Sequence, residues 1–230
     1  IKIIELLGNE WAHDNVHVPF GPVSLEEGTM STRHGRVVFL EDVLNRAVDQ
    51  TREIIKEKGV NTDNIEETAR QVGIGAVIFN ELSNNRIKDY VFSWSKVLDF
   101  NGETGPYVQY THARAASVLR NAGEEASTKA LDMANVKAEY ITSESAYELA
   151  KLVYALPQVV VDAGEKYEPS VVTRHIVDIA QAFNRFYHDC PILSAEDEQV
   201  RKLRLALTAA TKTVLGNAFE LICLRKIEQI

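Results

Sequence analysis

The chain has 230 residues, of which 45% are hydrophobic and 25% charged, and its formal net charge is −8. These fractions are typical of folded globular proteins and exclude a disordered chain, while the acidic total excludes a uniformly basic nucleic-acid-binding surface but not a local basic face. Since the sequence has no run of about 20 apolar residues and does not open with a signal peptide, we expect a cytoplasmic protein without a membrane partner.

The two cysteines, Cys190 and Cys223, lie far apart in the sequence. They have neither C-x-x-C spacing nor a nearby pair of histidines. We therefore expect two reduced thiols in the core and no structural zinc site.

The first 45 residues combine a helix end with two β-prone segments. The opening "IKIIELLG" predicts the last turns of a helix that ends at Gly8. The segments 15–21 ("NVHVPFG") and 36–40 ("RVVFL") favour strands. Between them lies "EEGTMSTRHG", a loop in which two glycines enclose hydroxyl and basic side chains.

Residues 41–59 and 64–83 show helical periodicity. The first of these helices has a continuous apolar face and ends at Gly59. The second contains Gly73 and Gly75, and each glycine inside a helix costs about 1 kcal/mol relative to alanine. We therefore predict that this helix makes a close contact at these two glycines.

Residues 106–123 predict a helix with two unlike faces, which Pro106 opens. The small and apolar face consists of Val108, His112, Ala115 and Leu119, and the aromatic and basic face consists of Tyr107, Tyr110, Arg114 and Ser117. Both tyrosines could be core residues with satisfied hydroxyl groups. They could instead form a surface on which bases stack while Arg114 contacts phosphate. Periodicity does not distinguish these two interpretations.

The C-terminal half predicts three amphipathic helices. Residues 143–157 carry a possible Ser145–Glu148 capping box, and Pro157 ends this helix or opens the next. Residues 168–191 place Val172, Ile176, Ile179 and Phe183 on one stripe. Residues 194–215 begin at a Ser194–Asp197 capping pair. Three such helices indicate a helical bundle.

Four blocks of the sequence, in the same order, resemble the C-terminal half of arginyl-tRNA synthetases, which are class I aminoacyl-tRNA synthetases. The blocks are "MSTRHGRVVFLEDVL", "GIGAVIFNELSNNRIKDYVFSW", "GPYVQYTHAR" and "EPSVVTRHIVDIAQAFNRFYHDCPIL". The resemblance covers essentially the whole chain. Four ordered blocks are far more specific than any one short motif.

The resemblance implies that the loop after residue 28 is this family's version of the class I KMSKS loop, which contacts ATP. Such a loop can bring backbone N–H groups, hydroxyls and cations to the charge that develops on the triphosphate. Ser31, Thr32 and Arg33 would be its catalytic residues, with hydrogen bonds from the hydroxyls and fixed positive charge from the guanidinium. The whole loop is Met30, Ser31, Thr32, Arg33, His34 and Gly35.

The loop departs in its charge from the full class I motif, K-M-S-K-S, and from this family's usual version of it, K-M-S-T-R-K-G. Thr29 stands where the full motif has its first lysine, Thr32 stands at the usual second lysine, and His34 replaces a lysine found in many relatives. Because histidine is mostly neutral at pH 7, this loop carries less fixed charge. The class I signature H-I-G-H occurs nowhere in the sequence. We therefore expect part of a longer enzyme, inactive by itself, in which ATP, Mg²⁺ and arginine bind through the missing catalytic half.

The later helices resemble the anticodon-binding domain of the same family, whose partner is tRNA-Arg rather than DNA. The resemblance implies tRNA contacts at Tyr107, Gln109 and Tyr110, with Arg114 as a weaker addition. Ile230 stands where a terminal methionine often contacts the anticodon. Arg174, Lys202 and Arg204 could contact phosphate, although a solvated charged face is the more ordinary interpretation.

The fold expected from these observations is mainly α. Residues 1–45 would be an α/β remnant of the catalytic Rossmann domain, residues 46–104 a helical connector that contacts the tRNA stem, and residues 105–230 the helical anticodon-binding bundle. The expected function is ATP-dependent ligation of arginine to tRNA-Arg. The alternative is a non-catalytic helical adaptor that binds tRNA or protein.

Overall fold

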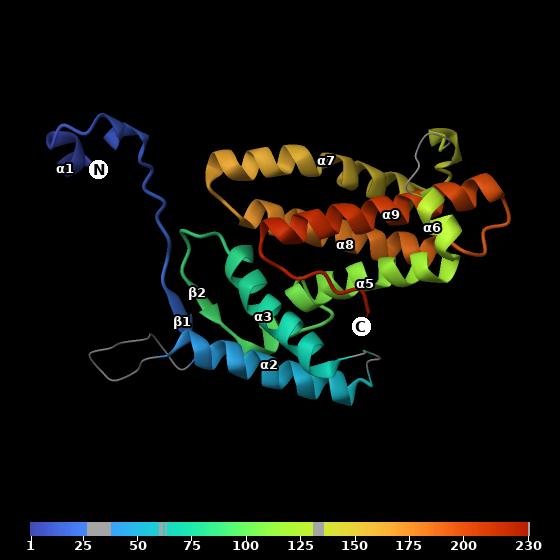
Figure 1. Ribbon diagram of the computed structural model, residues 1–230, viewed down its shortest axis with the longest axis horizontal. Helices are drawn as coiled ribbons and strands as arrows, with labels where there is room; N and C mark the ends of the chain where they lie inside the picture. Colours follow the sequence, from blue (N-terminus) through green and yellow to red (C-terminus); the bar gives the residue numbers. More distant parts are fainter. Residues whose placement is uncertain (27–37, 60–61, 63, 131–135, 230) are drawn as a thin grey trace.

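The computed structural model describes residues 1–26, 38–59, 62, 64–130 and 136–229, and these residues are mainly helical, as predicted (Figure 1). The elements are α1 (Lys2–Leu6), η1 (Glu10–Asp14), β1 (Val23–Leu25), α2 (Leu40–Glu57), α3 (Ile65–Ser83), β2 (Tyr90–Phe92), α4 (Trp94–Val97), α5 (Gly105–Ala122), α6 (Glu124–Ala130), η4 (Ala138–Tyr140), α7 (Glu144–Lys166), α8 (Ser170–Asp189) and α9 (Glu198–Leu221). Within these ranges, no helix is long and apolar enough to cross a membrane.

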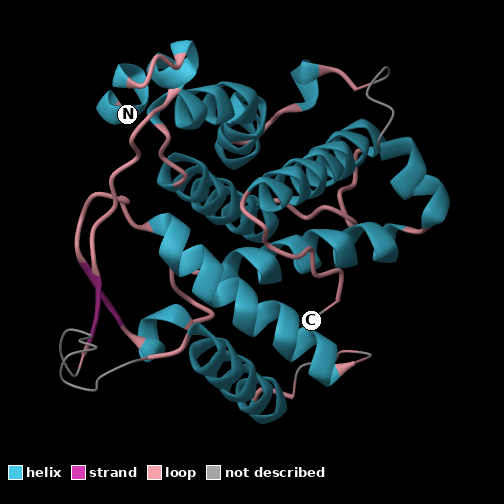
Figure 2. Cartoon of the chain, turned by 60° about the vertical axis from the view of Figure 1, so that its left-hand side comes forward, coloured by secondary structure: helices cyan, strands magenta, loops and turns pink. Residues whose placement is uncertain are grey.

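Among the described residues, the sheet consists of two strands at the edge of the molecule (Figure 2). β1 pairs with β2 in parallel, and Val23 lies opposite Tyr90. The strand predicted at 15–21 is wrong, because Pro19 and Pro22 have no N–H group to give to a ladder and the paired segment begins only at Val23. Of the strand predicted at 36–40, residues 36 and 37 lie outside the described ranges, and α2 already begins at Leu40.

The predicted helical bundle is formed by α5, α7, α8 and α9, with α6 against α9. In Figure 1, α7 lies along one side, α5 along the other, and α8 and α9 lie between them. The predicted stripe of α8 is buried as expected, and its Phe183 belongs to a core that includes Phe79, Phe186 and Phe219. Burial of these large apolar side chains supplies the main stabilisation of the bundle.

Two predicted helix starts and one predicted end are wrong in detail. The cap of α7 is Ser143, whose hydroxyl accepts from the N–H of Ala146, so Ser145 lies inside the helix. α7 also continues through Pro157 to Lys166. A proline inside a helix costs roughly 3 kcal/mol, and packing of α7 against α8 outweighs this cost. The cap of α9 is Asp197 alone, which accepts from two backbone N–H groups of the first turn.

The close contact predicted at the glycines of α3 is confirmed. A Cβ atom on Gly73 would lie 2.8 Å from the carbonyl carbon of Ala47 in α2, and one on Gly75 would lie 2.6 Å from Cδ1 of Leu224. A Cβ atom on Gly105, at the start of α5, would lie 3.0 Å from the carbonyl oxygen of Gly75. These glycines allow α2 and α5 to approach α3 more closely than any side chain would permit.

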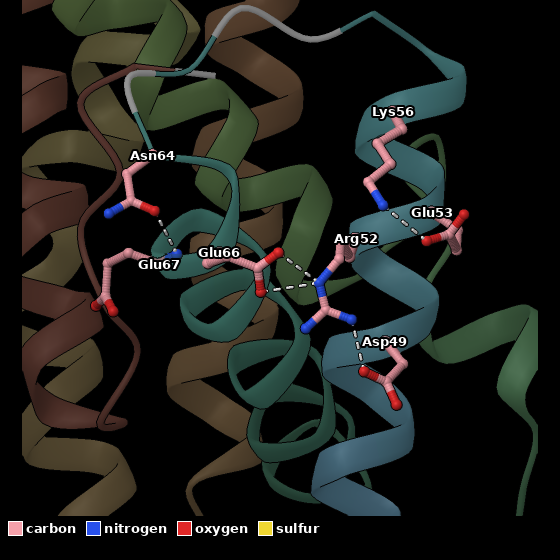
Figure 3. A network of polar contacts seen from close by, with 7 residues as sticks. All are labelled: Asp49, Arg52, Glu53, Lys56, Asn64, Glu66 and Glu67. Atoms are coloured by element: carbon pink, nitrogen blue, oxygen red, sulfur yellow. Dashed lines mark hydrogen bonds and ion pairs between the residues drawn. The ribbon is translucent and has the colours of Figure 1, made fainter.

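A polar network also joins α2 to α3 (Figure 3). Arg52 of α2 donates from Nε to both carboxylate oxygens of Glu66 at 2.8 and 2.9 Å, and from Nη1 to Asp49 at 2.6 Å. Asn64 caps α3 by accepting from the N–H of Glu67 at 3.1 Å. The bridge fixes the first turn of α3 against the middle of α2.

The cysteine prediction is half right. Cys190 is buried, whereas Cys223 is exposed, and both are free thiols. Cys223 has a φ of 58°, because the chain reverses direction there after the end of α9. Its side chain therefore points out of a turn rather than into the core.

Candidate nucleic-acid interface

An open groove of about 590 Å³ runs along the aromatic and basic face of α5. Tyr110, Arg114 and Arg120 of α5 form one wall, and Tyr187 at the end of α8 forms another. Leu193 and Gln229 complete the lining from the α8–α9 connection and the end of the chain. The groove therefore brings together residues that are up to 119 positions apart in sequence, from Tyr110 to Gln229.

Arg114 lies between two tyrosine rings in this groove. Its guanidinium carbon is 4.8 Å from the ring centroid of Tyr110 and 5.3 Å from that of Tyr187, both within cation–π range. The two tyrosine residues are 37% and 45% exposed, respectively, so each still has surface to offer a ligand. Nη1 of Arg114 donates to Oδ1 of Asn184, which holds the guanidinium in place. Exposed aromatic faces beside a fixed cation suit an unstacked base and its phosphate.

Asn184 of α8 connects the groove to the bundle. Its Nδ2 donates to the hydroxyl of Tyr107 at 2.9 Å and to that of Thr111 at 3.1 Å. The ring of Tyr107 is partly buried and packs against the main core. The structure thus places Tyr107 with its hydroxyl satisfied inside the protein and Tyr110 at the surface, so the two tyrosines lie in different environments.

Gln109 lies in the interior and not on the groove. It is fully buried, and its Nε2 donates to the carbonyl oxygen of Arg225 at 2.9 Å. Because its side chain is covered by the C-terminal residues, the direct RNA contact implied by the family resemblance does not fit this arrangement. Any effect of Gln109 on a ligand would pass through the segment that it holds.

Some predicted residues lie outside the described ranges. These are Ile230 and all six residues of the proposed ATP loop, Met30, Ser31, Thr32, Arg33, His34 and Gly35.

Of the basic residues considered for phosphate contact, Lys202 pairs with Glu198 at 2.8 Å, and Nη1 of Arg204 donates to the carbonyl oxygen of Pro191 at 2.7 Å. Arg204 thereby fixes the connection that contributes Leu193 to the groove.

The sequence patterns did not identify Tyr187, Asn184, Arg120 or Gln229. Asn184 and Tyr187 lie on α8 beside the apolar stripe that includes Phe183. A polar and an aromatic residue next to such a stripe were the only features of the sequence that could have pointed to them. Which helix they face is decided by the packing of α8 against α5, about 70 residues away in the sequence. Helical periodicity contains no information about that partner.

Across the described part of the chain, no three His, Cys, Asp or Glu side chains gather in a way that could hold a metal ion. Among the described residues, those that line the groove include two arginines and no carboxylate side chain. Its positive charge suits an anion with attached aromatic rings rather than a metal ion.

Two known protein families match this chain. The family "DALR anticodon binding domain" matches residues 108–230, which include the whole groove, and the family "tRNA synthetases class I (R), catalytic domain" matches residues 3–94. The chain is 53% identical over 229 residues to an arginine–tRNA ligase of Halothermothrix orenii and 51% identical over 229 residues to one of Clostridioides difficile. Each of these alignments takes in 100% of this chain and 39% of the relative.

Solved structures agree with these matches. The arginyl-tRNA synthetase of Thermus thermophilus superposes with a TM-score of 0.82 at 30% sequence identity, over 93% of this chain and 35% of that one. The arginyl-tRNA synthetase of Plasmodium falciparum shares the fold, with a TM-score of 0.78 at 20% identity over 100% of this chain and 38% of that one. The chain spans about 39% of the length of the curated relatives named above. It belongs to the arginyl-tRNA synthetase family, with a DALR anticodon-binding domain at 108–230 that follows a class I catalytic segment at 3–94.

Proposed function

We propose that this chain is part of an arginine–tRNA ligase, which uses ATP to attach arginine to tRNA-Arg in the cytoplasm. The observation that carries the proposal is the groove of Tyr110, Arg114 and Tyr187 inside the region that matches the anticodon-binding family. In that groove an anticodon base would stack on an exposed tyrosine ring while Arg114 or Arg120 meets the neighbouring phosphate. A non-catalytic adaptor is less well supported, because residues 3–94 match a catalytic domain.

The proposed division of labour follows the boundaries expected from the sequence. Residues 1–45 would belong to the catalytic domain, residues 46–104 would contact the tRNA stem, and residues 105–230 would bind the anticodon. The gap between the two family matches, after residue 94 and before residue 108, supports a boundary near residue 105. The catalytic-family match runs across residue 45 to residue 94, so it does not support a boundary between the first two parts. Gly105 opens α5 there.

The proposed ATP contacts are Ser31, Thr32 and Arg33, within the loop Met30–Gly35. Support for this role comes from the sequence motif and from the match of residues 3–94 to a class I catalytic domain. Mg²⁺ would arrive with the triphosphate and neutralise part of its charge. Since the H-I-G-H signature is absent from the sequence, arginine and most of the nucleotide would bind to residues that this chain does not include.

The test measures the affinity of the intact protein for tRNA-Arg after Tyr110→Ala and after Tyr187→Ala. Loss of one stacked base costs about 1–3 kcal/mol, so we expect binding to weaken by roughly 5- to 150-fold. The thermal midpoint should stay the same, because both rings are partly exposed. Salt is held constant throughout, since phosphate contacts make the affinity salt-dependent.

Tyr154→Ala is the matched control, because Tyr154 is 88% exposed on α7 at the other side of the bundle (Figure 1). Its affinity for tRNA-Arg should equal that of the wild type. Equal affinities for all three variants would remove the groove from the tRNA interface. An intact protein that binds tRNA-Arg and never charges it with arginine would establish the adaptor function instead.

A further inference from the structure

The residues after α9 form an ordered segment without helix or strand, Ile222–Gln229, which we name the C-terminal strap. After α9 the chain turns back at Cys223 and runs along α5 (Figure 1). A segment of this kind has no ladder or helix to fix its register. Its position must therefore be set by side chains from the elements around it.

Three side chains of α5 bind backbone carbonyl groups of the strap, those of Arg225, Ile227 and Glu228. Nε2 of Gln109 donates to the carbonyl of Arg225 at 2.9 Å, and Nη1 of Arg120 donates to that of Glu228 at 2.8 Å. Nδ1 of His112 lies 2.9 Å from the carbonyl oxygen of Ile227. Because a carbonyl can only accept, His112 carries its proton on Nδ1 and donates. The three bonds together fix the register of the strap along α5.

Apolar contacts hold the strap from the other side. Leu224 and Ile227 are 3% and 4% exposed. Leu224 fills the space left by the missing side chain of Gly75 on α3, and Ile227 packs in a small core with Val72 of α3. The strap is thus wedged between α3 and α5, with its apolar side chains inward and its carbonyl groups bound.

The far end of the strap reaches the groove. Gln229 lines it together with Tyr110 and Tyr187, and Arg120 both lines it and binds the preceding carbonyl, that of Glu228. The carboxylate of Glu228 is held in turn by Lys212 of α9 at 2.8 Å. A glutamine amide offers donors and an acceptor on one plane, which is the pattern that reads the edge of a base.

We propose that the C-terminal strap is a positioning device that presents the amide of Gln229 to the edge of one unpaired RNA base stacked in the groove. Gln229 is the specificity-determining residue, and Gln109, His112 and Arg120 are positioning residues that act through the strap. The proposal rests on the proposed function and adds to it a base-reading group and the side chains that place it. Tyrosine rings accept any base, because every base has a π face, whereas an amide at fixed register distinguishes one base edge from another.

The first experiment measures the affinity of the intact protein for a tRNA-Arg transcript and for transcripts changed at single anticodon-loop positions. Gln229→Ala should weaken binding of the unchanged transcript by about fivefold or more. At one loop position, the wild type should discriminate between bases and the variant should not. Gln158→Ala, an exposed glutamine on α7, is the control and should bind every transcript like the wild type.

The second experiment tests the positioning residues by a double-mutant cycle. His112→Leu removes the donor to Ile227, whereas His112→Asn keeps a donor near the position of Nδ1. We expect His112→Leu to reproduce the base-specific loss of Gln229→Ala, His112→Asn to restore most of it, and the double variant to lose no more than either single variant. Thr211→Val, which removes a buried hydroxyl bond inside α9, is the control for a merely structural loss.

If His112→Leu does not fold, Arg120→Met replaces it in the double-mutant cycle with Gln229→Ala. Arg120 is exposed, so this variant should fold. A lost phosphate contact at Arg120 would weaken binding of all transcripts equally, whereas a displaced strap weakens binding at one base position. Additive losses, or equal losses on every transcript, overturn the proposal. Unchanged binding by Gln229→Ala overturns it as well, while failure of the wild type to bind tRNA-Arg at all would instead overturn the proposed function.

Discussion

His112 is a buried histidine whose pKa lies below its usual value. Burial is the main cause, because removing water disfavours the charged imidazolium. The carbonyl of Ile227 and the carboxylate of Glu228 act in the opposite direction, and Lys212 and Lys226 lower the pKa further. The strap requires a proton on Nδ1, and the neutral ring supplies it in that tautomer. Burial therefore favours the neutral form of His112 without removing the donor that positions the strap.

We predict that His112 makes the protein less stable as the pH falls below about 7. In the unfolded chain histidine has a pKa of about 6.5, and in the folded protein the value is lower. Between these two values the unfolded state binds a proton that the folded state does not, so the free energy of unfolding decreases as pH decreases. One such group contributes a slope of at most about 1.4 kcal/mol per pH unit.

Urea unfolding at pH 7 and pH 5.5, for the wild type and for His112→Asn, measures this effect. The variant should lose less stability between the two pH values, because its side chain does not titrate. Other histidines contribute equally to both proteins and cancel in the comparison. The same pH dependence in both proteins would show that His112 does not control it.

Residue spacing predicted part of the groove. Tyr110 and Arg114 are four positions apart on a helix, a spacing that brings two side chains together, and they do form a cation–π pair. Tyr187 completes the same cluster from another helix, and no local pattern predicts that contact. Tyr107 shares the predicted face with Tyr110 but turns inward to Asn184. A face defined by periodicity therefore covers both a groove wall and a core contact.

At the scale of elements, the glycines of α3 determine how closely its neighbours pack. Gly73 lies against the backbone of Ala47, and Gly75 lies against Leu224 and the start of α5. The sequence predicted that these glycines make a close contact, since an unexplained glycine in a helix is costly. It did not predict the partners, because α2, α5 and the strap approach α3 from distant parts of the chain.

We predict that Gly73→Ala lowers the free energy of unfolding by about 1–3 kcal/mol, the usual cost of overpacking a close contact. The new Cβ atom would lie 2.8 Å from backbone atoms of Ala47, and backbone cannot move aside as a flexible side chain can. Gly164→Ala in α7 is the matched control, because its Cβ would meet nothing within 4 Å. That variant should gain about 0.5–1 kcal/mol from the better helix propensity of alanine.

Chemical denaturation of the two variants and the wild type compares these values. The opposite signs are the decisive result, since both changes add the same methyl group to a helix. Stabilisation by Gly73→Ala would mean that α2 and α3 separate without cost and that the close contact is unimportant.

At the scale of the whole molecule, contacts between distant residues join the N-terminal segment to the bundle. β1 pairs with β2, whose partner residues lie 67 positions further along the sequence, and the strap returns from the C-terminal end to α3. The helices themselves were predicted from their apolar periodicity, because each buries one face. The parallel strand pair was not predicted from the sequence, because strands of three residues are too short to show an alternating pattern.

Arg86 is a third link, and it joins three segments at once. Nη1 donates to the carbonyl of Pro19 at 2.7 Å, Nε donates to that of Tyr167 at 2.7 Å, and Nη2 donates to that of Lys166 at 3.4 Å. The side chain is only 22% exposed, and Glu168 lies 4.0 Å from Nε. One planar guanidinium thus ties the segment before β1 to the end of α7.

We predict that Arg86→Lys destabilises this junction, since an ammonium group keeps the charge but cannot bond three carbonyls in the fork geometry of a guanidinium. Loss of a bond from a charged donor costs about 1.5–3 kcal/mol. Amide hydrogen exchange should become faster in residues 20–25 and 87–92, which the link holds near the bundle, and should stay unchanged in the core of α8. Arg185→Lys, an exposed arginine on α8, is the control and should exchange like the wild type. Unaltered exchange at residues 20–25 in Arg86→Lys would show that the strand pair holds this segment without the arginine.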